Sequence, residues 1–322
     1  MKILVVASAL DLSLPYGCTA AWWQLLKGLH ENGAEVIATP YQGRPVESLW
    51  WRAYPNPCYR MGAAFAGLLR AKRWLSRGKA PRAGDGREGL GQRVQRGLVR
   101  RLVTPRWLRH LTAILEREKD VGAVLVLTVP LNHFRGIPTA LRERFGVPVI
   151  YYDGDLPASL PGFGGFHSGF SIYHGADVGE YDAILCNSQG ATDEVCRFGA
   201  RLTEVVWWGA DPHVFRPAES KEDIDVFFYG LGTEFRADWL RDMIAVPSRE
   251  LPGLRFVVAG AGLDVDLGRA ERVGRVAAAQ LNGYVSRARL NLNVARMAHA
   301  SVYASSTTRL FELAAMGCAI VT

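Results

Sequence analysis

The chain has 322 residues, of which 49% are hydrophobic and 21% charged, and this apolar content excludes a disordered coil. No apolar run reaches the roughly 18 residues that cross a bilayer, and the opening MKILVVASAL resembles a buried first strand more than a secretory signal. The five cysteines are scattered without the paired spacing of a metal-binding knuckle, so we expect reduced thiols. These features predict a cytoplasmic α/β protein.

The positive charge of the chain is concentrated in one segment. The net charge is +7, but residues 70–109 hold thirteen Lys and Arg against only Asp85 and Glu88, so the rest of the chain is net negative. Residues 76–92 are glycine-rich and basic, which predicts a mobile loop. Over 93–103, apolar and arginine positions alternate at helical spacing, which predicts a basic amphipathic helix. We therefore expect a basic, mobile insertion at about 70–109.

Apolar runs alternate with amphipathic segments along the first part of the chain. Unbroken apolar runs are typical of parallel strands that are covered on both faces. After the first of them, Trp22, Leu25, Leu26 and Leu29 recur at helical spacing. We expect strands over Ile3–Ala7, Val36–Ala38, Ala123–Leu127, Val147–Tyr152, Ala183–Cys186 and Glu204–Trp207.

A second series of the same kind follows Pro217. The polar residues around that proline predict a boundary, with an N-terminal domain over 1–216 and a C-terminal domain over 217–322. Two successive α/β series predict an α/β fold with two Rossmann-like domains facing a cleft. Because the chain ends inside an expected strand, we expect the second domain to be incomplete. The expected elements are strands Asp225–Tyr229, Leu254–Ala259 and Ala319–Thr322, and helices over Ala237–Ile244 and from Thr308.

Several segments resemble a known family. In "VVWWGADPHVFRP", Gly209, Asp211, Phe215 and Pro217 match a Gly-x-Asp-x-x-x-Phe-x-Pro hinge signature. The segment "SSTTRLFELAAMGCAIVT" is similar to a donor-site helix that a glutamate opens and Ala-x-Gly closes. In these features the chain resembles the GT-B glycosyltransferases, specifically family 4 (glycosyl transferases group 1) and its spore-maturation-like relatives.

The resemblance implies a hexosyltransferase-type enzyme that moves a sugar from a nucleotide diphospho-sugar to an acceptor. Retention of configuration is implied only by the family. Of the paired glutamates that many family-4 members carry, Glu312 fits the second and Ala304 stands at the first. The spore-maturation-like relatives instead show Arg-x-Phe-Glu, which Arg309 to Glu312 match.

Candidate donor-binding residues lie in the C-terminal domain. Glu312 is expected to bind the ribose, while Arg309 and the N–H groups around Thr308 face the phosphates, unless Thr308 and Glu312 are only a helix cap and a first-turn acid. The strand-end glycines Gly230, Gly232 and Gly260 permit close approach of the backbone to a ligand.

Arg236 is expected to act as a catalytic residue that neutralises the negative charge of the leaving group. The alternative is that Arg236 is a solvent-exposed arginine of the helix without a role in the reaction.

The acceptor side is expected in the N-terminal domain. Asp153 and Asp155 follow a predicted strand, and we expect one of them to position sugar or acceptor hydroxyls as a catalytic residue. The pair also has the spacing of a divalent-cation site, but we favour a metal-independent reaction without a cofactor. Gly17, in the first loop, and His174, in a Gly/aromatic loop, are further acceptor-side candidates.

Two interpretations of residues 70–109 stay open: peripheral docking on an anionic membrane, and a solubilising insertion. Nucleic acid is disfavoured as a partner because aromatic residues are sparse there and no reader motif occurs. Alternatives to glycosyl transfer are a non-catalytic glycosyltransferase-like binding protein and a GT-B-fold nucleotide-sugar epimerase. A dehydrogenase is disfavoured because neither strand–helix turn carries Gly-x-Gly-x-x-Gly.

Overall fold

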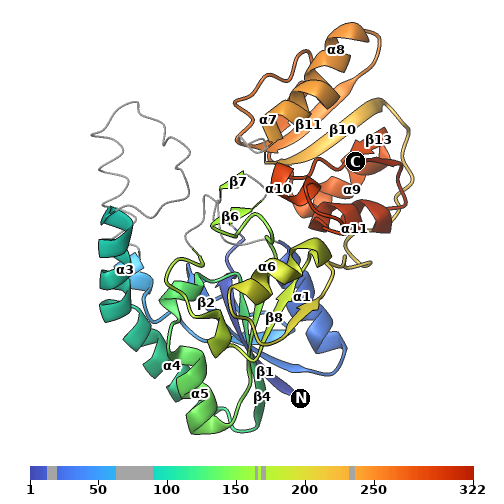
Figure 1. Ribbon diagram of the computed structural model, residues 1–322. Helices are drawn as coiled ribbons and strands as arrows, with labels where there is room; N and C mark the ends of the chain where they lie inside the picture. The colour runs from blue at the N-terminus through green and yellow to red at the C-terminus, as the bar shows by residue number, and fades with distance from the viewer. Residues whose placement is uncertain (13–19, 63–89, 164–165, 168–171, 232–235) are drawn as a thin grey trace. The chain divides into compact units, whose positions relative to one another are not determined.

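The computed structural model describes residues 1–12, 20–62, 90–163, 166–167, 172–231 and 236–322 (Figure 1). The chain divides into two compact units, Met1–Trp207 and Trp208–Thr322. The boundary expected after Arg216 therefore lies inside the second unit, with which residues 208–216 group.

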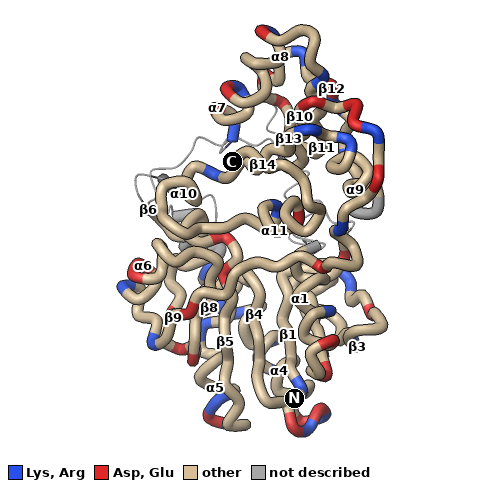
Figure 2. The backbone as a smooth tube through the Cα atoms, turned by 90° about the vertical axis from the view of Figure 1, so that its right-hand side faces the viewer, with Lys and Arg blue, Asp and Glu red and all other residues tan. Residues whose placement is uncertain are grey.

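The first unit is built on a seven-stranded parallel sheet in the order β3-β2-β1-β4-β5-β8-β9. Its central strands are apolar because both faces are buried, and β1 is buried from its second residue onward. Figure 2 shows the same pattern, with uncharged positions along β1, β4 and β5 and charges near the strand ends. The strands are β1 (Lys2–Ala9), β2 (Glu35–Gln42), β3 (Trp51–Ala53), β4 (Val121–Leu127), β5 (Val149–Asp153), β8 (Ala183–Cys186) and β9 (Thr203–Val205), and a separate hairpin joins β6 (Gly162–Phe163) to β7 (Phe166–His167).

Helices and short turns cover this sheet. The core contains Leu4 and Val6 from β1 and Trp107 and Leu111 from α4, so the helix seals one face of the sheet. The predicted amphipathic helix is present as α3, whereas residues 70–89 of the expected insertion lie outside the described residues. The elements are α1 (Ala20–Glu31), α3 (Leu90–Leu102), α4 (Thr104–Arg117), α5 (Ile137–Phe145) and α6 (Thr192–Arg197), with 3-10 turns η1 (Leu131–His133), η2 (Val178–Glu180) and η3 (Gln189–Ala191).

The second unit has a five-stranded parallel sheet in the order β12-β11-β10-β13-β14. Side chains alternate across it, so that Phe227 enters the core on one face and Phe228 the core on the other. The strands are β10 (Ile224–Leu231), β11 (Phe256–Ala261), β12 (Glu271–Gly274), β13 (Ala288–Leu292) and β14 (Ile320–Val321), and the α-helices are α7 (Ala237–Leu240), α8 (Val246–Glu250), α9 (Ala278–Ser286), α10 (Met297–Ala300) and α11 (Thr308–Ala315).

The helix expected over Ala237–Ile244 is longer and irregular. A π-helical stretch, η5 (Arg241–Ala245), separates α7 from α8. Pro247 at the start of α8 has no backbone N–H, so the carbonyl four residues earlier loses its α-helical donor. A local widening of the helix at that point is the expected response.

None of the helices within the described residues has the length and apolar character needed to cross a membrane.

Candidate functional site

Glycines form the carboxyl ends of β10 and β11. Gly230 and Gly260 are register partners with φ of 150° and 142°. A Cβ atom on Gly260 would fall on the carbonyl oxygen of Gly230, and one on Gly230 would collide with the guanidinium of Arg309. Bare backbone therefore lies beside Arg309, where a ligand can approach closely.

Arg309, in the first turn of α11, lies against aromatic rings and forms no ion pair within 4 Å among the residues that the structure describes. Its guanidinium carbon lies 5.0 Å from the ring centroid of Phe228 and 4.9 Å from that of Tyr229. Nη1 donates to the carbonyl of Val294 at 3.3 Å, whereas the buried Nε has no hydrogen-bond partner within the described part of the chain. Burial lowers the pKa of Arg309, against the opposite effect of Tyr229 and Glu312. Such a cation is suited to an anionic ligand.

Arg236 brings a second guanidinium to the same place. It is only 9% exposed, and its Nε donates to the carbonyl of Val294 at 2.9 Å. Two cations from distant segments thus bond one carbonyl oxygen just after β13. Two guanidinium groups are thus close together at this end of the sheet, an arrangement that is suited to phosphate groups.

Glu312 lies one turn further along α11 and is buried. Its Oε2 accepts a hydrogen bond from the Tyr229 hydroxyl at 2.9 Å. Burial and then the charge of Glu312 raise the pKa of Tyr229, which keeps this hydroxyl protonated as a donor. Tyr229 therefore connects Arg309 and Glu312 at the end of β10.

The start of α11 is not closed by a side-chain cap. The cap residue is Thr307 rather than the predicted Thr308, and its hydroxyl donates to Oδ1 of Asn293 at 2.8 Å instead of accepting a helix N–H. The first backbone N–H groups of a helix attract anions, and Thr308 and Arg309 occupy this first turn.

Asp153 occupies the carboxyl end of β5 in the first unit and is fully buried. Its Oδ2 accepts hydrogen bonds from Ser159 and Tyr173 at 2.6 Å each, and its Oδ1 accepts the N–H of Asp155 at 2.9 Å. Burial raises the pKa of Asp153 to about 6, although these hydrogen bonds act in the opposite direction. These hydrogen bonds hold the segment that follows β5 against the sheet, which gives Asp153 a structural role. Asp155 is half-buried and is therefore more accessible to a ligand than Asp153.

His174 follows Tyr173 directly and is therefore close to this network. Its backbone carbonyl accepts a hydrogen bond from Nδ2 of Asn132 at 3.0 Å. Of the remaining predicted residues, Gly17 and Gly232 lie outside the described residues.

The structure thus gathers Gly230, Gly260, Arg236, Arg309 and Glu312 in the second unit, and Asp153, Asp155 and His174 in the first. Sequence reasoning missed the contributions of Tyr229, Val294 and Asn293. The aromatic pair immediately before Gly230 was the available signal, because rings at a strand end can support a buried arginine.

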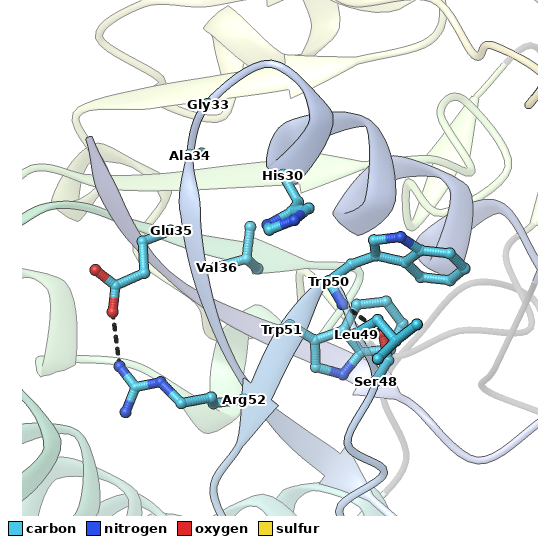
Figure 3. A pocket seen from close by; sticks show the side chains of 10 residues that line it. All are labelled: His30, Gly33, Ala34, Glu35, Val36, Ser48, Leu49, Trp50, Trp51 and Arg52. Atoms are coloured by element: carbon cyan, nitrogen blue, oxygen red, sulfur yellow. Dashed lines mark hydrogen bonds and ion pairs between the residues drawn. The ribbon is translucent and has the colours of Figure 1, made fainter.

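A hollow of about 370 Å³ lies beside β2 and β3, at the β3 edge of the first unit's sheet (Figure 3). It is formed by the end of α1, the amino end of β2 and the segment around Trp50, with His30 and Trp50 at its walls. The hollow contains none of the predicted site residues.

A family model described as glycosyl transferase-like matches residues 236–322. The match begins at Arg236 and includes Arg309 and Glu312. A comparison with curated proteins found no match.

Several solved structures share the architecture of the chain. The N-terminal domain of trehalose-6-phosphate phosphatase from Candida albicans is 13% identical with a TM-score of 0.59, over 98% of this chain and 80% of that one. An α-glucosyltransferase in complex with UDP and a 13-mer DNA with a central A:G mismatch is 10% identical with a TM-score of 0.55, over 99% and 78%. An α-glucosyltransferase with UDP-glucose and DNA containing an abasic site is 11% identical with a TM-score of 0.54, over 99% and 78%.

The chain has the GT-B fold. At these identities the likeness concerns the fold alone, and it confirms the predicted α/β class with two Rossmann-like units. The paired arginines lie in the part of the GT-B chain that the glycosyl transferase-like model covers.

Proposed function

We propose that the chain is a glycosyltransferase that transfers a sugar from a nucleoside diphosphate sugar to an acceptor. The observation that carries this proposal is the convergence of Arg236 and Arg309 on the carbonyl of Val294, where the Nε of Arg309 has no hydrogen-bond partner among the described residues. Two buried cations beside bare glycine backbone and an uncapped helix start are suited to a diphosphate.

In this proposal the second unit binds the donor and the first unit the acceptor. When the bond from the sugar to the diphosphate breaks, the electron pair stays on the phosphate oxygen, and the two guanidinium groups stabilise that charge. Glu312 accepts hydrogen bonds from the ribose hydroxyls while Tyr229 holds its other oxygen. Asp155 and His174 are the candidates that position acceptor hydroxyls.

We also propose that the reaction is metal-independent and retaining. The arginine pair supplies the positive charge that a divalent cation provides in other phosphate sites, which supports the first point. The proposed retention of the sugar's anomeric configuration rests on the sequence resemblance alone. The proposed cytoplasmic location is supported by the described cysteines, Cys58, Cys186, Cys196 and Cys318, which are free thiols.

A thermal-shift screen of the full chain with UDP, GDP, ADP and NAD, in the presence of EDTA, tests the donor site. A ligand that binds only the folded state raises the melting temperature. We expect one nucleoside diphosphate to raise it selectively and Arg309→Met to abolish the shift. Arg289→Met is the matched control, because Arg289 lies in the same unit with a side chain that is 64% exposed.

A turnover assay then separates the candidate activities. Release of nucleoside diphosphate that depends on an added acceptor supports glycosyl transfer. Conversion of the donor without an acceptor would point to an epimerase, and binding without turnover to a non-catalytic protein. A shift with NAD alone would contradict the proposal altogether.

A further inference from the structure

The outer face of α3 exposes a row of apolar side chains. Val94, Leu98 and Leu102 are 64%, 55% and 44% exposed. They are spaced by four residues and therefore lie one above the other on the same side of the helix. Single exposed apolar residues are ordinary, but three in a row form a continuous patch, which marks an interaction surface.

The opposite side of α3 is fixed to the first unit. The helix continues end to end into α4 (Figure 1) and contacts η1, and Val103, which separates the two helices, packs against the core. The side chain of Arg96 lies against Gly175, and the charge of Arg100 is near enough to Glu180 to act on the pKa of that carboxyl. These two arginines therefore serve contacts within the unit.

Other arginines border the apolar row. Arg101 is exposed and lies three residues after Leu98, on the same side of the helix. Arg106 is exposed as well, and its Nη1 donates to the carbonyl of Leu102. The apolar row is thus combined with cations at its carboxyl end.

The charge of the surrounding sequence indicates what this face meets. Residues 90–109 contain six arginines and no acidic residue, and residues 70–89 are also net positive. A second copy of the chain, or residues 70–89 themselves, would bring like charges together. A bilayer with anionic lipids offers an apolar interior for the exposed side chains and negatively charged headgroups for the arginines, so it complements this face of α3.

We infer that the outer face of α3 docks on a membrane surface that contains anionic lipids. Val94, Leu98 and Leu102 enter the boundary between headgroups and acyl chains, and Arg101 and Arg106 meet the lipid phosphates. This surface belongs to the first unit and the proposed donor site to the second, so vesicle binding and nucleotide binding test two different proposals.

The test is co-sedimentation of the full chain with vesicles of phosphatidylcholine, with and without an equal part of phosphatidylglycerol. We expect binding only to the anionic vesicles, weakening as salt is added. Replacing Val94, Leu98 and Leu102 together by Gln is expected to lower the partition coefficient by about tenfold or more. Arg101→Gln is expected to lower it by about fivefold.

The matched control replaces Leu49, Leu202 and Leu251 by Gln, three exposed apolar side chains outside α3. This variant is expected to bind vesicles as the unaltered chain does. All variants are expected to keep the melting temperature of the unaltered chain and its rise on binding the nucleoside diphosphate. Equal binding of the α3 variant and the unaltered chain, or no binding to anionic vesicles, would overturn the inference. So would dimerisation of the vesicle-free chain that the α3 variant abolishes, because a second copy would then cover this face.

Discussion

At the scale of single residues, Arg309 is placed for binding at some cost in stability. Within the described part of the chain its buried Nε has no hydrogen-bond partner, and burial lowers the pKa of Arg309, which means that the folded state disfavours the charged form. The aromatic rings of Phe228 and Tyr229 compensate only in part. Such a cost is common where a site must be ready for an anion.

We therefore predict that Arg309→Met stabilises the empty protein. Methionine fills a similar space against the rings without a buried charge, so the free energy of unfolding is expected to rise by about 1 kcal/mol. Chemical denaturation followed by circular dichroism measures this change. A loss of stability would mean that the attraction between Arg309 and Glu312 outweighs the burial of the charge.

Glu118, the residue that follows α4, is the opposite case, a buried carboxylate whose charge is compensated by several donors. Its Oε1 accepts from Nη1 of Arg52 at 2.8 Å and from the Tyr54 hydroxyl at 2.7 Å, and Lys2 lies at 3.5 Å from Oε2. The hydrogen bonds from Arg52 are the main reason that the pKa of Glu118 falls to about 2. This cluster connects the amino end of β1, and β3 with the residue that follows it, to the carboxyl end of α4.

We predict that Glu118→Gln lowers the free energy of unfolding by about 2 kcal/mol at neutral pH. Because the pKa is lower in the folded than in the unfolded state, the carboxylate stabilises the fold above about pH 4.5, and this contribution is lost as the pH falls toward 2. The difference between variant and unaltered chain is therefore expected to shrink over that window in pH-dependent denaturation. Glu116→Gln, in an exposed pair with Arg144, is the control and should change little at any pH. A constant difference down to pH 2 would contradict the account.

At the scale of elements, the pairing of β10 with β11 depends on glycine at both strand ends. A side chain on Gly260 has no room because the Gly230 carbonyl occupies its position, and the φ of 142° disfavours any other residue. The same close approach leaves the backbone open beside Arg309.

Gly260→Ala is accordingly predicted to destabilise the second unit by about 3 kcal/mol or more and to abolish the nucleotide-dependent thermal shift. Gly253→Ala is the control, since a Cβ at Gly253 meets no atom within 4 Å. Thermal unfolding of both variants measures the effect. If Gly260→Ala unfolded like the control, the tight strand pairing at this end of the sheet would be wrong.

Strand prediction succeeded where burial makes the sequence uniformly apolar. Ala183–Cys186 was predicted with the bounds that β8 has, and β1, β2, β4 and β10 lie where apolar runs predicted them. The missed strands are the short hairpin strands β6 and β7 and the strands β3, β12 and β13, of which the last three carry charged or polar residues such as Arg52, Glu271 and Asn291. Polar side chains at sheet edges and in hydrogen-bonded positions remove the periodic signal on which such predictions depend.

For the candidate site, the sequence suggested individual residues but not how they are arranged. Motif resemblance pointed to Arg309 and Glu312, and the glycines pointed to a close backbone approach. That Arg236 and Arg309 meet at Val294 depends on how β13 lies beside β10, which no local pattern encodes. Likewise, the complete burial of Asp153 depends on Ser159 and Tyr173 further along the chain.

At the scale of the whole molecule, the chain consists of two units with separate cores. The core of the first unit runs from Leu4 to Val195, and the two cores of the second lie on the opposite faces of its own sheet. Each unit can therefore respond to a ligand separately, and unfolding of the full chain need not be two-state. The account assigns the nucleoside diphosphate to the second unit.

Amide hydrogen exchange of the full chain, with and without the nucleoside diphosphate that the thermal screen selects, tests this assignment most directly. Binding slows exchange where backbone amides are covered or local opening is suppressed. The account predicts slower exchange at 228–231, 258–261, 292–296 and 307–313, with no such effect in Arg309→Met. Protection confined to residues 1–207, or protection that Arg309→Met leaves intact, would contradict the claim that the paired arginines hold the diphosphate.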